Sequence, residues 1–144
     1  MADSGTDIKI VFTPSGRQGH VPAGTTVLQA ARTLGVDIDS VCGGRALCGR
    51  CQVDVGTGDF AKHGISSGAG SLCGVTAVES RYAEKKGLAE GRRLSCQSTL
   101  QSDVVIDVPP ESQVHNQLIR KAADDRQIEM DPVIRLCLVE VREP

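Results

Sequence analysis

Four of the six cysteines are spaced as metal ligands. Cys42, Cys48 and Cys51 lie within ten residues, with five and then two residues between neighbours, and Cys96 follows far downstream. A cysteine thiolate is a soft ligand that suits zinc, copper(I) and iron–sulfur clusters. Three thiolates on one tight loop and a fourth from a distant segment can together surround a metal centre.

The spacing favours an iron–sulfur cluster over zinc or disulfide bonds. A [2Fe–2S] cluster takes four thiolates, two for each iron. Structural zinc sites usually contain two C-x-x-C pairs, and this chain has only the pair formed by Cys48 and Cys51. The first residues lack the pattern of a signal peptide, so we expect a cytoplasmic protein, and the cytosol keeps thiols reduced. We therefore predict a [2Fe–2S] cofactor.

The fourth ligand has two candidates. Cys96 lies in a predicted strand, whereas Cys73 lies in a Gly- and Ser-rich stretch, residues 61–74, that we expect to be a mobile loop and a poor place for a rigid ligand. A third cysteine, Cys137, falls on the apolar face of a late predicted strand and reads as a small core residue. The predicted ligands, as metal and cofactor-binding residues, are Cys42, Cys48, Cys51 and Cys96, with Cys73 as the alternative to Cys96.

The elements around the cysteine loop predict an α+β fold. Alternating and β-branched residues indicate strands at 7–13, 18–21, 51–55, 94–100 and 103–108. Helices are indicated at 25–35 and 76–88, and residues 59–75 read as a loop or insertion. This order fits a β-grasp ferredoxin fold, a mixed sheet over one main helix.

The chain changes character after Pro110. We expect residues 1–110 to be a [2Fe–2S] ferredoxin-type domain and residues 111–144 to be a linker and the start of a following, absent domain. Residues 133–141 alternate and predict one late strand. An unpaired strand is a liability, so this one is expected to join the sheet of the first domain or belong to a second.

Charge and composition exclude several classes of function. Aromatic residues make up only 2% of the chain, and no basic stripe is present, so nucleic-acid binding is unsupported. No apolar run is long enough to cross a membrane, and no hydrolytic or transferase site stands out. Two pairs of basic residues are expected to lie on solvated faces, namely Lys85–Lys86 and Arg92–Arg93. The alternative is that they dock an acidic partner.

Three stretches of the sequence resemble one family closely. They are V-C-G-G-R-A-L-C-G-R-C-Q-V, V-E-S-R-Y-A-E-K-K-G-L-A-E-G-R-R-L-S-C-Q and D-V-V-I-D-V-P-P-E-S. The cysteine spacing is similar to that of adrenodoxin-type ferredoxins. The amino-acid sequence of all three stretches resembles that of the N-terminal ferredoxin domain of the reductive activators of corrinoid enzymes. The resemblance covers residues 7–143.

This resemblance implies a one-electron donor rather than a catalyst in its own right. In that family the cluster returns cobalt in a corrinoid protein from Co(II) to Co(I), and a C-terminal actin-like domain hydrolyses ATP to drive the step. The implied partners are a corrinoid protein and an upstream reductase or electron donor. No ATP-binding motif occurs before Pro144, so we expect an excised module or a truncated gene, and the ATPase activity is not carried over.

A free-standing adrenodoxin-type ferredoxin that serves a monooxygenase or dioxygenase is the alternative. Such carriers resemble one another in a strongly acidic docking surface. Residues 79–93 here hold three Glu and five Lys or Arg, a balance that would repel the usual basic partner. The charge of residues 79–93 therefore favours the first hypothesis, an electron donor to a corrinoid protein.

Overall fold

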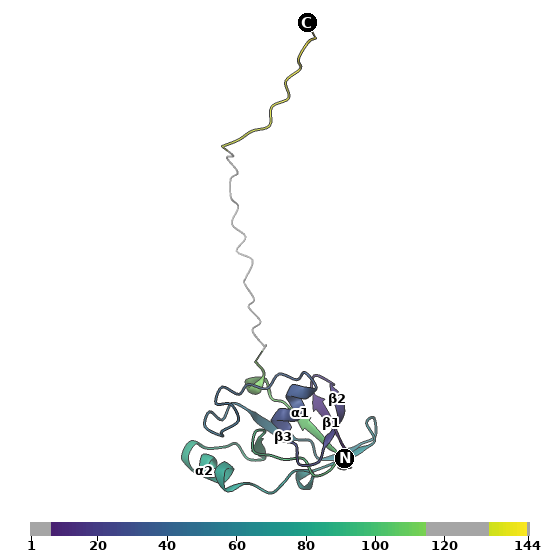
Figure 1. Cartoon of the computed structure of the whole chain (residues 1–144), viewed down its shortest axis with the longest axis vertical. Helices are drawn as coiled ribbons and strands as arrows, with labels where there is room; N and C mark the ends of the chain where they lie inside the picture. Colours follow the sequence, from purple (N-terminus) through teal and green to yellow (C-terminus); the bar gives the residue numbers. More distant parts are fainter. Residues whose placement is uncertain (1–6, 115–132, 144) are drawn as a thin grey trace, which may run out of the picture.

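The computed structural model describes residues 7–114 and 133–143, and residues 7–114 contain all of its helices and strands (Figure 1). In chain order these are β1 (Asp7–Thr13), β2 (Gln18–Pro22), α1 (Val27–Thr33), β3 (Gln52–Val55), β4 (Gly58–Phe60), β5 (Ile65–Ser67), the 3-10 turn η1 (Ala69–Ser71), α2 (Ala77–Lys86), β6 (Arg92–Leu94), β7 (Val104–Asp107) and the 3-10 turn η2 (Pro110–Ser112).

Five strands form one mixed sheet in the order β2-β1-β7-β3-β6. β1 and β7 run parallel, and the other neighbouring pairs in this sheet are antiparallel. The buried side of α1 joins the sheet in one hydrophobic core. The predicted α+β fold, a mixed sheet over one main helix, is confirmed.

The two faces of the sheet are buried against different partners, because side chains alternate along a strand. On one face, β1 and β7 supply the main core with Ile8, Ile10, Phe12, Val104 and Ile106. On the other face, Val11 and Val105 form a small second cluster with Ile65 of β5, and Phe60 of β4 packs against it.

This second cluster explains why residues 59–75 are not the open loop that their composition predicted. Residues 58–67 form the β4–β5 hairpin, which covers Val11 and Val105, and η1 follows. Beyond η1, Leu72 forms a bridge with Leu100, and the Cys73 N–H donates to the Thr99 carbonyl oxygen at 2.9 Å. The expectation of a mobile stretch around Cys73 was wrong, because backbone pairing and apolar burial hold this segment.

The helices agree more closely with the sequence. The Thr26 hydroxyl caps α1 by accepting from the Gln29 N–H at 3.2 Å, and the Thr76 hydroxyl caps α2 by accepting from the Glu79 N–H at 3.2 Å. The core-facing residues of α1 are Val27, Leu28, Ala30 and Ala31, each at most 3% exposed. No helix in the described part of the chain reaches the length and apolar character of a membrane span.

Two predicted strands were wrong. The strand expected over 94–100 ends at Leu94, because the N–H groups of Gln97 and Ser98 both donate to the Leu94 carbonyl and turn the chain. Residues 133–143 contain no strand, and Cys137 is exposed rather than a core residue. The alternating pattern of that segment therefore has no sheet partner among the described residues.

Removing the hydroxyl that caps α1 tests how far the fold depends on this helix. We expect Thr26→Ala to cost about 1 kcal/mol and to lower the thermal midpoint of the cluster-loaded protein by about 4–8 °C. Thr33→Ala is the control, since its hydroxyl donates only to the Gln29 carbonyl within the same helix. Equal thermal midpoints for the two variants would show that the cap adds no more stability than the Thr33 hydroxyl does.

Candidate metal centre

The first pair of thiols lies on the irregular loop between α1 and β3. Cys42 Sγ and Cys48 Sγ are 3.5 Å apart. The loop turns tightly enough to bring them together because four of its residues have φ values between 54° and 86°, namely Gly43, Gly44, Ala46 and Gly49. Glycine adopts this left-handed conformation at no steric cost, and Ala46 is the non-glycine exception.

The second pair of thiols joins the end of the loop to a distant segment. The pairing of β3 with β6 places Gln52 opposite Leu94, and the Ser95 N–H then donates to the Cys51 carbonyl at 2.9 Å. The chain turns at once, and the Cys96 thiol hydrogen-bonds that of Cys51. Both cysteines are buried, with exposed fractions of 1% and 7%.

Backbone N–H groups in the first turn of α1 also hold the chain reversal that follows β6. The Leu28 N–H donates to the Ser95 carbonyl at 3.0 Å, and the Val27 N–H donates to the Ser98 carbonyl at 2.9 Å. Amide groups at the start of a helix have no partner within the helix, so they are free to hold a neighbouring segment. Cys96 is therefore positioned by a turn tied to both α1 and β3, and not by a strand of its own.

Two pairs of thiols are the donor set that a binuclear cluster requires. Each iron of a [2Fe–2S] cluster takes two thiolates, whereas structural zinc takes four ligands around one ion. Within residues 7–114 and 133–143, no three His, Cys, Asp or Glu side chains gather around a single point. The arrangement fits the binuclear group, and the assignment of Cys42, Cys48, Cys51 and Cys96 as its ligands stays a prediction.

Hydrogen bonds ease the ionisation of one thiol in each pair. The hydrogen bond with the Cys96 thiol lowers the pKa of Cys51 to about 6, against the effect of burial. Burial raises the pKa of Cys42, but backbone hydrogen bonds from its own loop, chiefly that of Cys48, bring it down to about 6. The contact with Cys51 raises the pKa of Cys96 because the shared proton stays there. Since thiolates are the ligands, metal binding displaces this proton.

Cys73 lies in a different environment from the two pairs. Its Sγ accepts from the Thr99 N–H at 3.3 Å and lies 3.7 Å from the Gln97 carbonyl oxygen. The Gln97 side chain reaches the other way, donating to the Gly44 carbonyl at 3.3 Å. Cys73 is thus half-buried, and its hydrogen-bonding partners are the Thr99 and Gln97 backbone and the Arg93 guanidinium, not thiols.

Glu79 is a buried carboxylate beside β6 whose contacts the sequence did not reveal. It is 1% exposed, its Oε1 accepts from Arg93 Nε at 3.0 Å and from the Leu94 N–H at 2.7 Å, and its Oε2 accepts from Arg93 Nη2 at 3.1 Å. Arg93 Nη1 also donates to the Cys73 carbonyl at 3.0 Å. The carboxylate therefore clamps α2 to the end of β6, two residues before Cys96.

The prediction that Arg93 lies on a solvated face was wrong. Its side chain is only 12% exposed, because it contacts Glu79. The one available signal was the T-x-x-E spacing of Thr76 and Glu79, which is the capping-box pattern. That pattern predicts a carboxylate turned back to the helix start, whereas here it faces Arg93.

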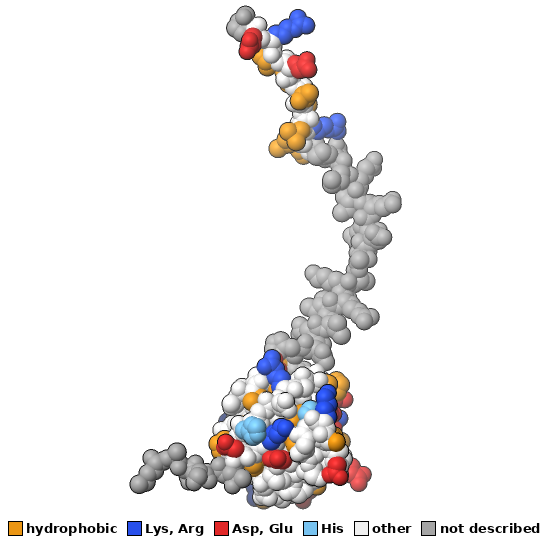
Figure 2. All heavy atoms as spheres, turned by 90° about the vertical axis from the view of Figure 1, so that its right-hand side faces the viewer, with side chains coloured by type: hydrophobic (Ala, Val, Ile, Leu, Met, Phe, Trp, Pro, Cys, Tyr) orange, Lys and Arg blue, Asp and Glu red, His pale blue; other side chains and the backbone are white. Residues whose placement is uncertain are grey.

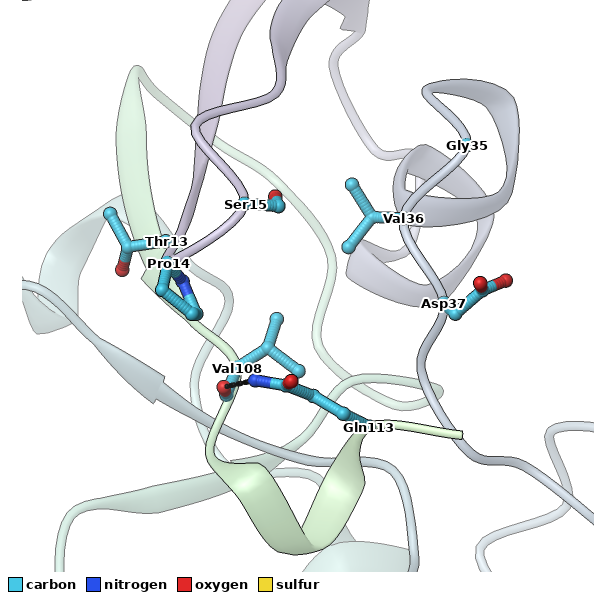
Figure 3. A pocket seen from close by; sticks show the side chains of 8 residues that line it. All are labelled: Thr13, Pro14, Ser15, Gly35, Val36, Asp37, Val108 and Gln113. Carbon is cyan, nitrogen blue, oxygen red and sulfur yellow. Dashed lines mark hydrogen bonds between the residues drawn. The ribbon is translucent and has the colours of Figure 1, made fainter. Parts of the chain in front are cut away.

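A hollow of about 290 Å³ lies away from the thiols. It is lined by Thr13, Pro14, Ser15, Gly35, Val36, Asp37, Val108 and Gln113 (Figure 3). No cysteine lines it, and Gln113 partly closes it by donating to the Val108 carbonyl at 2.8 Å. It therefore adds no ligand to the metal centre.

The chain belongs to the family of 2Fe-2S iron-sulfur cluster binding domains, which it matches over residues 11–101. This family defines the cofactor as a [2Fe–2S] cluster and the activity as one-electron transfer with redox partner proteins. A curated relative is one of the subunits of the Na(+)-translocating NADH-quinone reductase of Haemophilus ducreyi, 33% identical over 112 residues. The match covers 77% of this chain and 24% of that protein, so the chain spans about a quarter of the relative's length.

Solved structures share the fold. The ISC-like [2Fe-2S] ferredoxin of Pseudomonas putida matches with a TM-score of 0.56 and 27% identity, over 75% of this chain and 97% of that one. A reductive activator for a corrinoid, iron-sulfur protein matches with a TM-score of 0.50 and 24% identity, over 75% of this chain and 15% of that one. The second likeness is one of fold alone.

Two cysteine variants test the choice of the fourth ligand. We expect Cys96→Ser to lose or destabilise the cluster, because it removes one thiol of the buried pair, and Cys73→Ser to keep it. Iron and acid-labile sulfide content, with the visible spectrum, measure the difference. Cluster loss from Cys73→Ser with retention in Cys96→Ser would reassign the ligand.

The Glu79–Arg93 clamp is tested by removing its carboxylate. We expect Glu79→Ala to cost about 3–5 kcal/mol of unfolding free energy, because it leaves a buried guanidinium without its charge partner. Glu84→Ala, on the exposed side of the same helix, should cost less than about 0.5 kcal/mol. The double variant Glu79→Ala with Arg93→Ala should recover part of the loss in urea denaturation. Equal costs for Glu79→Ala and Glu84→Ala would contradict the clamp.

Proposed function

We propose that this chain supplies single electrons to a corrinoid protein and returns its cobalt from Co(II) to Co(I), with Cys42, Cys48, Cys51 and Cys96 holding the cluster. A [2Fe–2S] cluster, when bound, takes up and releases one electron at a time. The loop glycines let the backbone turn tightly, and the backbone amides of Arg45, Leu47 and Cys48 donate hydrogen bonds that stabilise negative charge on the Cys42 sulfur. The protein thus supplies burial, hydrogen bonds and a surface for its partner.

The charge around α2 is the observation that carries the choice of partner. Of the three Glu within residues 79–93, Glu79 is neutralised by Arg93 inside the domain, which leaves Glu84 and Glu90 exposed. Arg81, Lys85 and Lys86 are also exposed on the same helix. This surface is basic, unlike the acidic face that the adrenodoxin-type alternative implies. The resemblance of the three sequence stretches to reductive activators supports the same choice.

The division into residues 1–110 and 111–144 is part of the proposal. The matched portion is 24% of the quinone reductase relative and 15% of the reductive activator, so modules of this fold occur within longer proteins. Six apolar side chains between residues 133 and 141 are 76–105% exposed, namely Val133, Ile134, Leu136, Leu138, Val139 and Val141. Burying them needs a further surface, which a following domain would provide.

A free-standing ferredoxin for a monooxygenase or dioxygenase is the second candidate. The observation in its favour is the ISC-like ferredoxin of Pseudomonas putida, of which the match covers 97%. That protein shows that this fold also serves as a complete carrier.

The proposed reaction can be tested in its downhill direction. Reduction of Co(II) is the step that ATP hydrolysis drives in the proteins this chain resembles, so the reverse transfer should be spontaneous. We expect oxidised holoprotein, mixed anaerobically with a Co(I) corrinoid methyltransferase, to gain the rhombic EPR signal that dithionite also produces. The Co(I) absorption band should disappear in step with it.

Two outcomes would contradict this function. A colourless protein with stoichiometric zinc would exclude electron transfer altogether. Failure to accept electrons from the Co(I) protein, together with rapid electron transfer to a haem monooxygenase, would favour the second candidate.

A further inference from the structure

A groove of about 240 Å³ lies between α2 and the ligand loop, which is residues 34–51 and joins α1 to β3. Its lining residues are Arg45, Ala46, Leu47, Val78, Arg81, Tyr82, Lys85 and Lys86. Four of these eight are cationic, three are aliphatic, one is Tyr82, and none is acidic. The groove therefore combines an apolar floor with a wholly positive rim.

The groove adjoins the thiols, because its lining residue Leu47 directly precedes Cys48 in the chain. Backbone hydrogen bonds from Arg45 and Leu47 reach the Cys42 thiol, and one from Ala46 reaches the Cys96 thiol. A molecule seated on Leu47 would therefore be separated from the metal centre by little more than the loop backbone. Electron transfer is favoured by such short separations, so this is a suitable exit from the domain.

Direct contacts couple α2 to the loop. Tyr82 packs on Gly49 so closely that a Cβ at this position would overlap the Tyr82 hydroxyl, and Gly49 has a φ of 64°. Lys86 Nζ donates to the Leu47 carbonyl at 2.7 Å and lies 5.6 Å from the centre of the Tyr82 ring. The groove is thus a defined surface made by two packed elements.

Exposed apolar side chains gather in the same two segments. Within residues 7–114, five large apolar side chains are well exposed. Leu47 and Val41 belong to the ligand loop, Val75 lies just before α2 and Val78 in its first turn, with exposed fractions of 44–71%. Only Val114 lies elsewhere. Exposed apolar area beside a charged rim is typical of a protein-docking site.

The cations of the rim are not neutralised by the domain itself. Among the described residues, Arg45, Arg81, Lys85 and Lys86 form no ion pair with a carboxylate, whereas Arg50, Arg92 and Arg93 do. In contrast, the side of the domain turned to the viewer in Figure 2, away from α2, shows acidic, basic and histidine side chains intermixed. The positive charge of the groove is thus available to a partner.

We propose that this groove docks an acidic redox partner, whose carboxylates pair with Arg45, Arg81, Lys85 and Lys86 while an apolar side chain covers Leu47. The inference rests on the proposed electron-transfer function and identifies its contact surface. The whole chain carries a net charge of −2, so its overall charge would repel an acidic partner and only the local surface would attract it. The two effects predict salt dependences of opposite sign.

The test measures electron transfer to two haem proteins of opposite charge. Chemically reduced holoprotein is mixed in a stopped-flow instrument with cytochrome b5, which is acidic, or cytochrome c, which is basic. The rate to cytochrome b5 should fall as salt rises from about 10 mM to about 500 mM, because the Debye length shrinks. Arg81→Glu or Lys85→Glu should slow it about three- to tenfold at low salt.

Lys62→Glu is the matched control, since Lys62 is exposed in the β4–β5 hairpin and its reversal changes the net charge equally. Its rate should stay within about twofold of the parent. Rates to cytochrome b5 that are equal for Arg81→Glu and Lys62→Glu, or that rise with salt, would overturn the docking surface while leaving electron transfer intact. If Arg81→Glu slowed oxidation of the cluster by the small anion Co(EDTA)⁻ but not by cytochrome b5, the groove would be a small-anion site. That result would overturn the docking surface too. A cluster-loaded protein that reduces neither haem protein would overturn both proposals.

Discussion

The backbone pairing that continues from β3 and β6 to Ser95 and Cys51 is the contact on which the site depends. It brings Cys96 to Cys51 across a long stretch of chain, and the turn that follows is held by amide groups of α1. A shift of one residue in this register would turn Leu94 and its neighbours to the opposite face. Glu79 opposes such a shift, because its carboxylate accepts from the Leu94 N–H and pairs with Arg93.

Much of the fold could be predicted because its signals are local. The hairpin of β1 and β2 has alternation and a Pro-Ser-Gly turn, and α1 and α2 each follow a threonine that caps them. The spacing of Cys42, Cys48 and Cys51 likewise indicated the cofactor before any fold was known. The strand predicted around Cys96 is wrong, since this cysteine lies on a turn.

The features that the sequence did not reveal depend on contacts between distant residues. The β4–β5 hairpin is stabilised by Val11 and Val105 on the second face of the sheet, and neither strand of the hairpin exceeds three residues. Glu79 reads as an ordinary helix residue until Arg93 is placed beside it. Cys137 shows the opposite error, because an alternating pattern without a sheet partner buries nothing.

The contact between Lys86 and Leu47 also has an electronic consequence. The Leu47 carbonyl that accepts from Lys86 and the Cys48 N–H that reaches the Cys42 thiol belong to one peptide group. Hydrogen bonds in series polarise one another, so the ammonium group makes this N–H a better donor to sulfur. A side chain on the outer surface of α2 thus acts, through a single planar amide, on the electron density of a cysteine it never touches.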